Sequence, residues 1–224
     1  MRLAAAGEVL GPEVTLIHCQ SLGEEAWRVI ADSGCRVVLA STSDAQLGCE
    51  EGVPPIQEAL DVGIVPALSV DVECCLTSDL FTQMQVTLNV QRMHCAQHRH
   101  RGEEAPDPIP VRRALECATI AGAAANGVDA VTGSLTPGKQ ADIVLIGAED
   151  LNNMPLNDAV ATVVLGADSG NVDKVFVGGR PRKWGEVLGV DLPALRREVN
   201  ASRDFLLERV GPQSGSDDMA AASA

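Results

Sequence analysis

The alternation of apolar runs with helical segments in residues 14–70 constrains the fold of this chain more than any other feature. Three runs rich in Val, Ile and Leu are typical of strands: residues 14–19, 36–40 and 64–70. A helical segment lies in each interval and ends at a glycine, Gly34 or Gly63, which suits the left-handed end of a helix. Short connections of this kind join parallel strands, so the pattern predicts an α/β fold whose strands are buried on both faces.

Local signals mark the segments between and after these strands. Ser21 and Glu24 have the spacing of a capping box, which predicts that the first helix starts there. Residues 41–52 are rich in Ser, Thr, Asp and Gly and are typical of a loop. Two later helices are predicted, at residues 78–92 and 110–126. The polar residues 97–108 between them are predicted to form an exposed loop.

The pattern changes after residue 130, where short β-type segments separated by turns replace the earlier alternation. These segments are residues 131–146, 159–165 and 172–177. Gly178-Gly179 is a hairpin signal, so the region reads as a small antiparallel β unit. Residues 192–210 have helical periodicity, and the tail at residues 211–224, rich in Ser, Gly, Asp and Ala, is typical of disorder.

Charge and cysteine usage exclude several classes of protein. The formal net charge of −14 argues against a nucleic-acid surface, which needs a basic patch. No signal segment opens the chain, and no apolar run is long enough to span a bilayer. The seven cysteines lack the spacing of a disulfide framework, which favours reduced thiols. We therefore expect a cytoplasmic protein that binds neither nucleic acid nor membrane.

His18 and Asp71 are candidate functional residues because both lie at the carboxyl ends of predicted strands. Functional groups of parallel sheets gather at those ends. On the pattern alone, His18 also fits a buried histidine bonded to backbone, and Asp71 fits a cap of the following helix. Ser43 and Asp44 fit either the lining of a substrate pocket or a Ser/Asp turn.

Two further clusters carry reactive side chains. The segment His94-Cys-Ala-Gln-His98-Arg-His100 has the ligand types of a zinc site. No second pair of ligands occurs elsewhere, which favours a solvated basic turn. Cys74 and Cys75 are adjacent, and because vicinal disulfides are strained, two loop residues are favoured over a redox site.

Five segments, in order, resemble the amidohydrolase superfamily, in particular its cytosine deaminases and triazine hydrolases. They are Ile17-His18-Cys19; Ser41-Thr-Ser-Asp44 with Gly48 and Gly52; Ser69-Val-Asp71; Ala118-Thr-Ile-Ala-Gly-Ala123; and Gly133-Ser-Leu-Thr-Pro-Gly-Lys-Gln-Ala-Asp-Ile-Val144. The last string is the most specific, because in that family it marks the return of the chain from a barrel to a small β domain. Together the matches span residues 14–177.

The resemblance implies the C-terminal part of a metal-dependent hydrolase with a TIM-like barrel. About three parallel strands with their helices would occupy residues 1–130, as the sixth to eighth strands of that barrel. A small β-sandwich portion would occupy residues 131–190, where Lys139 and Asp142 would be structural. Residues 191–224 would form a C-terminal helix and a disordered tail.

The resemblance also implies a chemistry. In this family a divalent metal, Zn²⁺ or Fe²⁺, activates water that hydrolyses carbon–nitrogen bonds other than peptide bonds. His18 resembles the sixth-strand histidine and Asp71 the eighth-strand aspartate, so both would be catalytic and Asp71 would be a metal ligand. Ser43 and Asp44 would contact a small heterocyclic substrate. The implied reaction is deamination or dechlorination of an aminated heterocycle.

The chain departs from the family at the remaining metal ligands. The family's His-x-His pair, its fifth-strand histidine and the acid that follows have no counterpart before His18. One Asp and one His do not close a metal site, and three strands do not close a barrel. We therefore expect a fragment or truncated form that binds metal weakly, shows no turnover alone and pairs through the open barrel edge. The alternative is an inactive remnant that is an interaction partner of a full-length relative.

Overall fold

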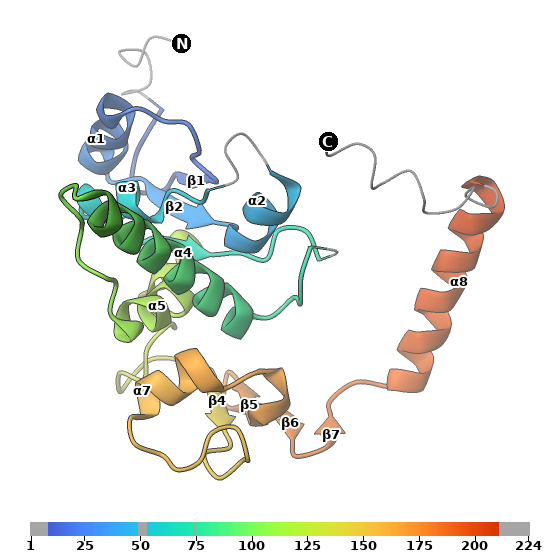
Figure 1. Cartoon of the computed structure of the whole chain (residues 1–224). Coiled ribbons are helices and arrows are strands. Elements are labelled where there is room, and N and C mark those ends of the chain that lie inside the picture. The colour runs from blue at the N-terminus through green and yellow to red at the C-terminus, as the bar shows by residue number, and fades with distance from the viewer. Residues whose placement is uncertain (1–8, 49–52, 74, 211–224) are drawn as a thin grey trace. The chain divides into compact units, whose positions relative to one another are not determined.

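The computed structural model describes residues 9–48, 53–73 and 75–210 and divides the chain into two compact units (Figure 1). The first unit ends at Gly185, and the second begins at Glu186. The predicted disorder of residues 211–224 lies outside the described residues. None of the helices in the described residues is long and apolar enough to cross a membrane.

A parallel three-stranded sheet organises the first unit. Its strands are β1 (Thr15–Ile17), β2 (Arg36–Leu39) and β3 (Ala67–Leu68), in that order. The predicted parallel α/β arrangement is confirmed, although β3 is shorter than its apolar run. Full burial of β1 is wrong: Ile17 is 57% exposed, because β1 is an edge strand in the described part of the chain. The central strand β2 is the buried one, with Val37 and Leu39 inaccessible to solvent.

The helices that follow β1 and β2 correct two predictions. Helix α1 (Glu24–Ser33) begins after Gly23 without a side-chain cap, so the predicted capping box at Ser21 is wrong. Ser21 has a left-handed backbone (φ 55°), which places it outside the helix. The loop predicted at residues 41–52 is wrong in its first part, because helix α2 (Ser41–Leu47) starts immediately after Ala40, and residues 49–52 lie outside the described residues. Helix α3 (Ile56–Asp61) ends before Gly63, as predicted.

The later helices differ from prediction mainly at their ends. Helix α4 (Leu80–Arg101) takes in the first five residues of the polar loop predicted at residues 97–108 and stops at left-handed Gly102, after which residues 103–108 form no helix or strand, as predicted. Polar residues such as Gln and Arg have good helix propensity, so polarity alone does not end a helix. The single helix predicted over residues 110–126 is two helices, α5 (Val111–Ala118) and α6 (Ile120–Ala125), which are separated at Thr119.

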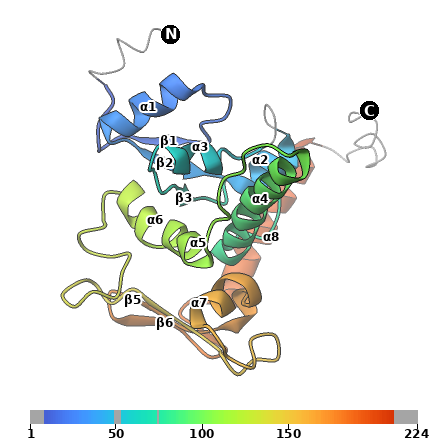
Figure 2. The ribbon, with the colours of Figure 1, turned by 60° about the vertical axis from the view of Figure 1, so that its left-hand side comes forward.

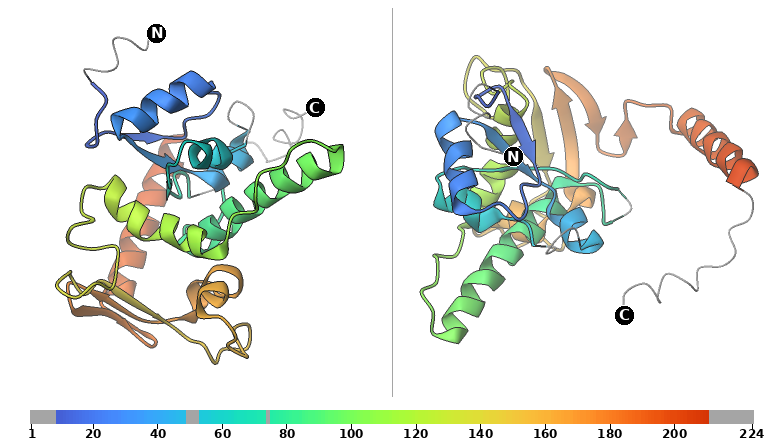
Figure 3. Two further views of the ribbon diagram at one scale, coloured as in Figure 1. Left: turned by 90° about the vertical axis from the view of Figure 1, so that its left-hand side faces the viewer. Right: turned by 90° about the horizontal axis from the view of Figure 1, so that it is seen from above.

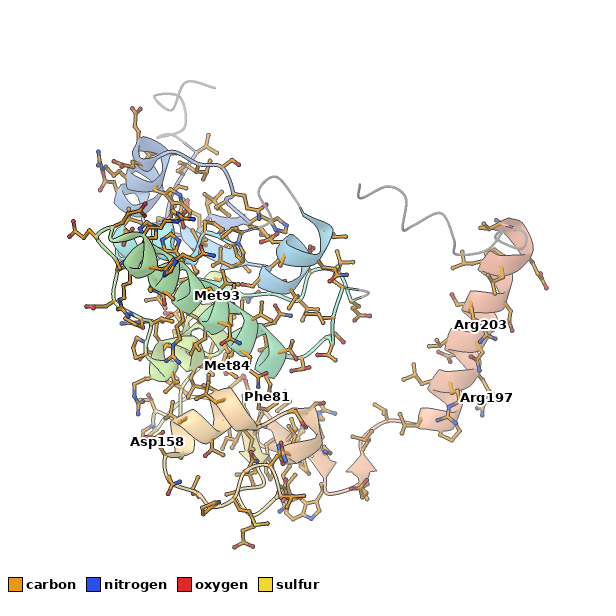
Figure 4. The ribbon with its side chains drawn as sticks, in the orientation of Figure 1. Phe81, Met84, Met93, Asp158, Arg197 and Arg203 are labelled. Carbon is orange, nitrogen blue, oxygen red and sulfur yellow. The ribbon has the colours of Figure 1, made fainter. Side chains whose placement is uncertain are left out.

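The core lies between these helices and the sheet. Figure 2 shows α5 and α6 beside the sheet, on the side away from α1, and both helices contact β3. The largest buried apolar side chains come from α1, β2, α4 and the helical segment near residue 164: Trp27, Ile30, Leu39, Met84, Leu88 and Val164. In Figure 4, Phe81 and Met84 mark the part of α4 nearest α7, whereas Met93 faces solvent.

An antiparallel sheet follows in the first unit, with strands β4 (Ile143–Ile146), β5 (Val172–Val177) and β6 (Arg180–Trp184). The predicted hairpin is confirmed: Val177 pairs with Arg180 across Gly178 and Gly179, which both have positive φ, as a type I′ turn requires. The β-sandwich remains a prediction, because the described residues of this region form one sheet.

The strand predicted at residues 159–165 is wrong. These residues form helix α7 (Ala159–Ala161), which continues into a π-helical turn (Thr162–Gly166). Asp158 starts this helix by accepting a hydrogen bond from the amide of Ala161 at 2.7 Å. A short apolar run suits either a strand or a helix, and the cap decides in favour of the helix.

The second unit contains strand β7 (Val187–Leu188) and helix α8 (Leu192–Val210). Figure 3 shows α8 as one continuous helix, in agreement with the predicted helical segment. No residue of α8 is buried in the described structure.

Candidate functional site

Three segments that follow the parallel strands meet at one rim of the sheet. His18 follows β1, α2 follows β2, and Asp71 lies three residues after β3. The backbone amide of His18 still bonds to Val38 (3.0 Å), which extends the ladder one residue past β1. Because the strands are parallel, their carboxyl ends share this rim, and so do the predicted site residues.

Two adjacent residues of α2 contact the other two site residues. Nδ1 of His18 lies 2.8 Å from Oδ1 of Asp44. The hydroxyl of Ser43 lies 2.9 Å from Oδ2 of Asp71 and 3.1 Å from the carbonyl of Ala40, either of which accepts its single proton. The first turn of α2 therefore touches His18 through one side chain and Asp71 through the next.

Burial differs sharply within this group. Asp44 is 1% exposed and Ser43 is equally buried, whereas the side chain of His18 is 39% exposed and Asp71 is exposed. Oδ2 of Asp44 is buried and has no hydrogen-bond partner in the described residues. The buried pair thus lies behind the two groups that face solvent.

The backbone at both exposed residues is unusual. His18 has φ 67° and Asp71 has φ 58°, values in the left-handed region that is uncommon for residues other than glycine, although asparagine, aspartate and histidine adopt it more often than the rest. Such conformations cluster at functional sites, where the surrounding structure holds them. The amide of Asp71 is held by the hydroxyl of Ser69 at 3.1 Å.

Cys19 is the reactive side chain nearest to His18 in sequence. Burial, with a smaller effect of Cys35, raises the pKa of its thiol to about 11. The nucleophilic form of cysteine is the thiolate, so the raised pKa disfavours nucleophilic chemistry at Cys19 near neutral pH.

The sequence indicates the four rim residues but not the contacts between them. Substrate contact by Ser43 and Asp44 stays a prediction, and no feature of the sequence points to a role for Ser69. The available signal was the Ser-Thr-Ser-Asp string itself, because short polar side chains after a buried strand commonly bond to neighbouring groups.

The histidine-rich segment of α4 is separate from this rim. The rings of His94 and His98 are 4.4 Å apart, and His98 pairs with Glu103 at 3.1 Å. Cys95 is buried and accepts a hydrogen bond from Gln91. Among the described residues no group of three or more His, Cys, Asp or Glu side chains is placed to hold a metal ion.

A cavity of about 480 Å³ lies at the opposite end of the sheet. Its lining includes Arg36, at the start of β2, Ile64, before β3, and the α5 residues Arg113 and Glu116. None of the four rim residues lines it, so this cavity is not the candidate site.

The segment Gly133–Val144 is held by its own polar side chains. The ammonium of Lys139 donates to the carbonyls of Asp129 and Thr132. Asp142 accepts hydrogen bonds from the amide of Gly178 and the hydroxyl of Thr132, both at 2.7 Å, and these bonds lower the pKa of its carboxyl. Asp142 connects the entry of the antiparallel sheet to its hairpin, and Lys139 holds the segment before that entry, so both contacts are structural.

Comparison with known proteins identifies the family of this chain. The Amidohydrolase family profile matches residues 2–182. The chain belongs to the amidohydrolase family. One curated relative is the 5-methylthioadenosine/S-adenosylhomocysteine deaminase of Acetivibrio thermocellus, which is 32% identical over 168 residues. That match covers 74% of this chain and 36% of the relative, so the chain spans well under half of the relative's length.

Solved amidohydrolase structures share the fold. A zinc-bound adenosine deaminase from Xanthomonas campestris superposes with a TM-score of 0.76 at 23% identity, covering 91% of this chain and 44% of that protein. Atrazine chlorohydrolase from Arthrobacter aurescens TC1, complexed with zinc and atraton, gives a TM-score of 0.73 at 20% identity, covering 85% and 41%. The predicted family and amidohydrolase fold are thereby confirmed, and at these identities the structural likeness concerns the fold alone.

Proposed function

We propose that this chain forms part of the active-site rim of a hydrolase that removes an amino group from an adenosine-type nucleoside. The observation that carries the proposal is the convergence of His18 and Asp71 on one strand-end rim, each held by a neighbouring residue of α2. The substrate class rests on the relatives, because one is named as a deaminase of methylthioadenosine and S-adenosylhomocysteine and a structural neighbour as an adenosine deaminase.

The proposed reaction is hydrolytic deamination. Water adds to the ring carbon that bears the amino group, a proton moves to the leaving nitrogen, and ammonia departs. Asp71, exposed at the rim, would accept a proton from the attacking water. The exposed nitrogen of the His18 imidazole would accept a hydrogen bond from the attacking water and orient it toward the ring carbon. Dechlorination of a triazine is the related outcome for a substrate with chloride as leaving group.

The metal expected from the family does not fit the described residues alone. The zinc-bound neighbours support a divalent metal in the family. The described residues, however, contain no group of three potential ligands, whereas zinc sites use three or four protein ligands. We therefore derive no reaction step through a metal, and Asp71 as a ligand remains part of the proposal.

A segment exchange tests this function. Residues 14–177 of this chain would replace the matching segment of the Acetivibrio thermocellus deaminase, of which the match covers 36%. The zinc-loaded chimera is expected to release ammonia from 5′-methylthioadenosine. His18→Gln and Asp71→Asn are each expected to lower kcat about 10² to 10⁴-fold, the usual effect of losing one acid–base group.

Glu103→Gln is the matched control, because it alters a second histidine–carboxylate pair away from the rim, and it should leave the rate unchanged. A folded, zinc-loaded chimera without turnover on adenosine-type nucleosides or triazines would refute the proposed function. Full activity of the His18 and Asp71 variants would refute the assignment of those residues.

A further inference from the structure

The burial of Asp44 needs an explanation beyond stability. A carboxylate removed from water is unfavourable unless hydrogen bonds replace the lost hydration. Asp44 is 1% exposed, yet only one of its oxygens has a partner, which is Nδ1 of His18, and Oδ2 has none in the described residues. A carboxylate placed solely to stabilise α2 would bond to backbone amides of the first turn, and α2 has no side-chain cap hydrogen bond.

The hydrogen-bonding capacity of the two groups fixes which nitrogen of His18 carries a proton. An ionised carboxylate accepts hydrogen bonds and donates none. The 2.8 Å contact therefore requires the proton on Nδ1 of His18, which leaves Nε2 as the nitrogen free for chemistry. Because His18 is 39% exposed and Asp44 is enclosed, the contact anchors the ring from its buried side.

We infer that Asp44 is a positioning residue, which holds His18 in the Nδ1–H tautomer and directs Nε2 toward the rim shared with Asp71. The inference deepens the proposed function, on which its catalytic meaning rests. The backbone supports it: His18 has left-handed φ, so its ring is carried by an uncommon main-chain conformation and gains its orientation from a side-chain contact. This role differs from the substrate contact that the sequence suggested for Asp44.

Ser43 has the corresponding place beside Asp71. Its hydroxyl reaches Oδ2 of Asp71 at 2.9 Å from the residue adjacent to Asp44. Two consecutive buried residues therefore orient two exposed ones, and both lie in the first turn of α2. A one-residue change in where α2 begins would therefore move both side chains away from their partners.

The tautomer of His18 can be measured without any enzymatic activity. Long-range ¹H–¹⁵N spectra of the 224-residue chain, labelled at histidine and recorded at about pH 8.5 where imidazole is ordinarily neutral, distinguish Nδ1–H from Nε2–H. His18→Gln identifies the His18 signals among the four histidines. The expected result is predominantly Nδ1–H in the wild type.

Two substitutions of Asp44 sharpen the test. Asn presents a donor as well as an acceptor, so Asp44→Asn should raise the Nε2–H fraction about threefold or more. Asp44→Glu keeps the acceptor and should retain the Nδ1–H form. Glu103→Gln makes the same chemical change at the more exposed His98 pair and should leave the His18 signals unchanged.

Predominant Nε2–H in the wild type would overturn the inference, even if the variants failed to fold. So would an unchanged tautomer in a folded Asp44→Asn protein. In the active chimera, Asp44→Asn should lower kcat about 10²-fold or more with little change in KM, as expected when the imidazole of His18 has the wrong tautomer. If the chimera proved inactive while the tautomer responded as described, the proposed function would fail and the positioning role would stand.

Discussion

At the scale of single residues, this protein places short polar side chains where they constrain their neighbours. Ser43 and Asp44 do so at the rim, and Lys139 does so at the entry of the antiparallel sheet. Ser43 and Asp44 bond to side chains distant in sequence, and Lys139 bonds to backbone carbonyls. Such contacts have two separable effects, on stability and on the orientation of a functional group.

Lys139 should affect stability and not catalysis. Lys139→Met removes a charged donor from the carbonyls of Asp129 and Thr132, and hydrogen bonds to charged groups contribute about 1.5 to 3 kcal/mol. Partial exposure of the side chain favours the lower end. Urea denaturation should therefore show a lower midpoint with an unchanged slope, whereas Arg112→Met at an exposed site of α5 should have little effect. Lost turnover in a chimera of unchanged stability would contradict a structural role.

At the scale of elements, the ends of helices are set by individual caps. Asp79 precedes the long helix α4 and accepts hydrogen bonds from the amide (2.8 Å) and the hydroxyl (3.1 Å) of Thr82. The cap formed by Asp79 depends on pH. Burial raises the pKa of its carboxyl, but hydrogen bonds from Thr77 and Thr82 outweigh that effect, so the pKa lies below its ordinary value.

Asp79→Ala should lower the free energy of unfolding by about 1 kcal/mol at neutral pH, the usual effect of losing an N-cap. Since the folded-state pKa is depressed, the stabilisation is present above the unfolded-state value of about 3.9 and is lost as pH falls through the folded value. The difference between wild type and variant should therefore shrink in acid, as measured by denaturation at several pH values. Asp107→Ala, at an exposed loop position, serves as control. A difference that does not depend on pH would show that the carboxylate is not the cap.

Elements with local signals were predictable from the sequence, and those decided by tertiary contacts were not. Strand β2 and the Gly178-Gly179 hairpin follow from residues within each segment. Helix α2 does not, because Ser41 and Thr42 have poor helix propensity and are held by Thr87 (2.7 Å) and Gln83 of α4. These partners lie more than forty positions away in the chain.

The same distinction applies to the candidate site. The positions of His18 and Asp71 at strand ends follow from the topology of a parallel sheet. Their left-handed backbone and their contacts with Asp44 and Ser43 do not, because neither a positive φ nor a particular side-chain rotamer has a sequence signal at these residue types. The catalytic and ligand roles themselves remain proposals.

At the scale of the whole molecule, the parallel sheet has two edges without a partner strand in the described residues, at β1 and β3. Unpaired strand edges favour association with another chain, and charged side chains on an edge oppose it. Ile17, on β1, exposes more than half of its apolar side chain at such an edge.

We predict that the chain self-associates through β1. Ile17→Lys should shift the population toward monomer in sedimentation velocity, because lysine places a charge on the edge strand. Leu135→Lys makes the same kind of change at a residue that is 78% exposed, outside any helix or strand and far from the sheet in sequence, and it should not alter the association. An equal effect of both substitutions would point to general solubility instead of edge pairing.

Metal binding is a second property of the whole molecule. Since the described residues hold no group of three potential ligands, zinc titrated into this chain should show no tight stoichiometric binding by calorimetry. The segment-exchange chimera is the positive control. Tight binding to the chain that is lost in Asp71→Asn would contradict this prediction and show that the chain completes its own site.

The left-handed residues of the rim set a limit on thermostability. Relative to glycine, each L-residue in this conformation is unfavourable by about 1 kcal/mol or more. Ser21 is exposed and outside the candidate site, so Ser21→Gly should raise the melting temperature without loss of a functional side chain. At His18 and Asp71 the same replacement would remove the imidazole and the carboxylate. Variants selected for heat resistance alone would thus lose the side chains proposed for catalysis. A library screened for both heat resistance and activity of the chimera should accept glycine at residue 21 and reject it at residues 18 and 71.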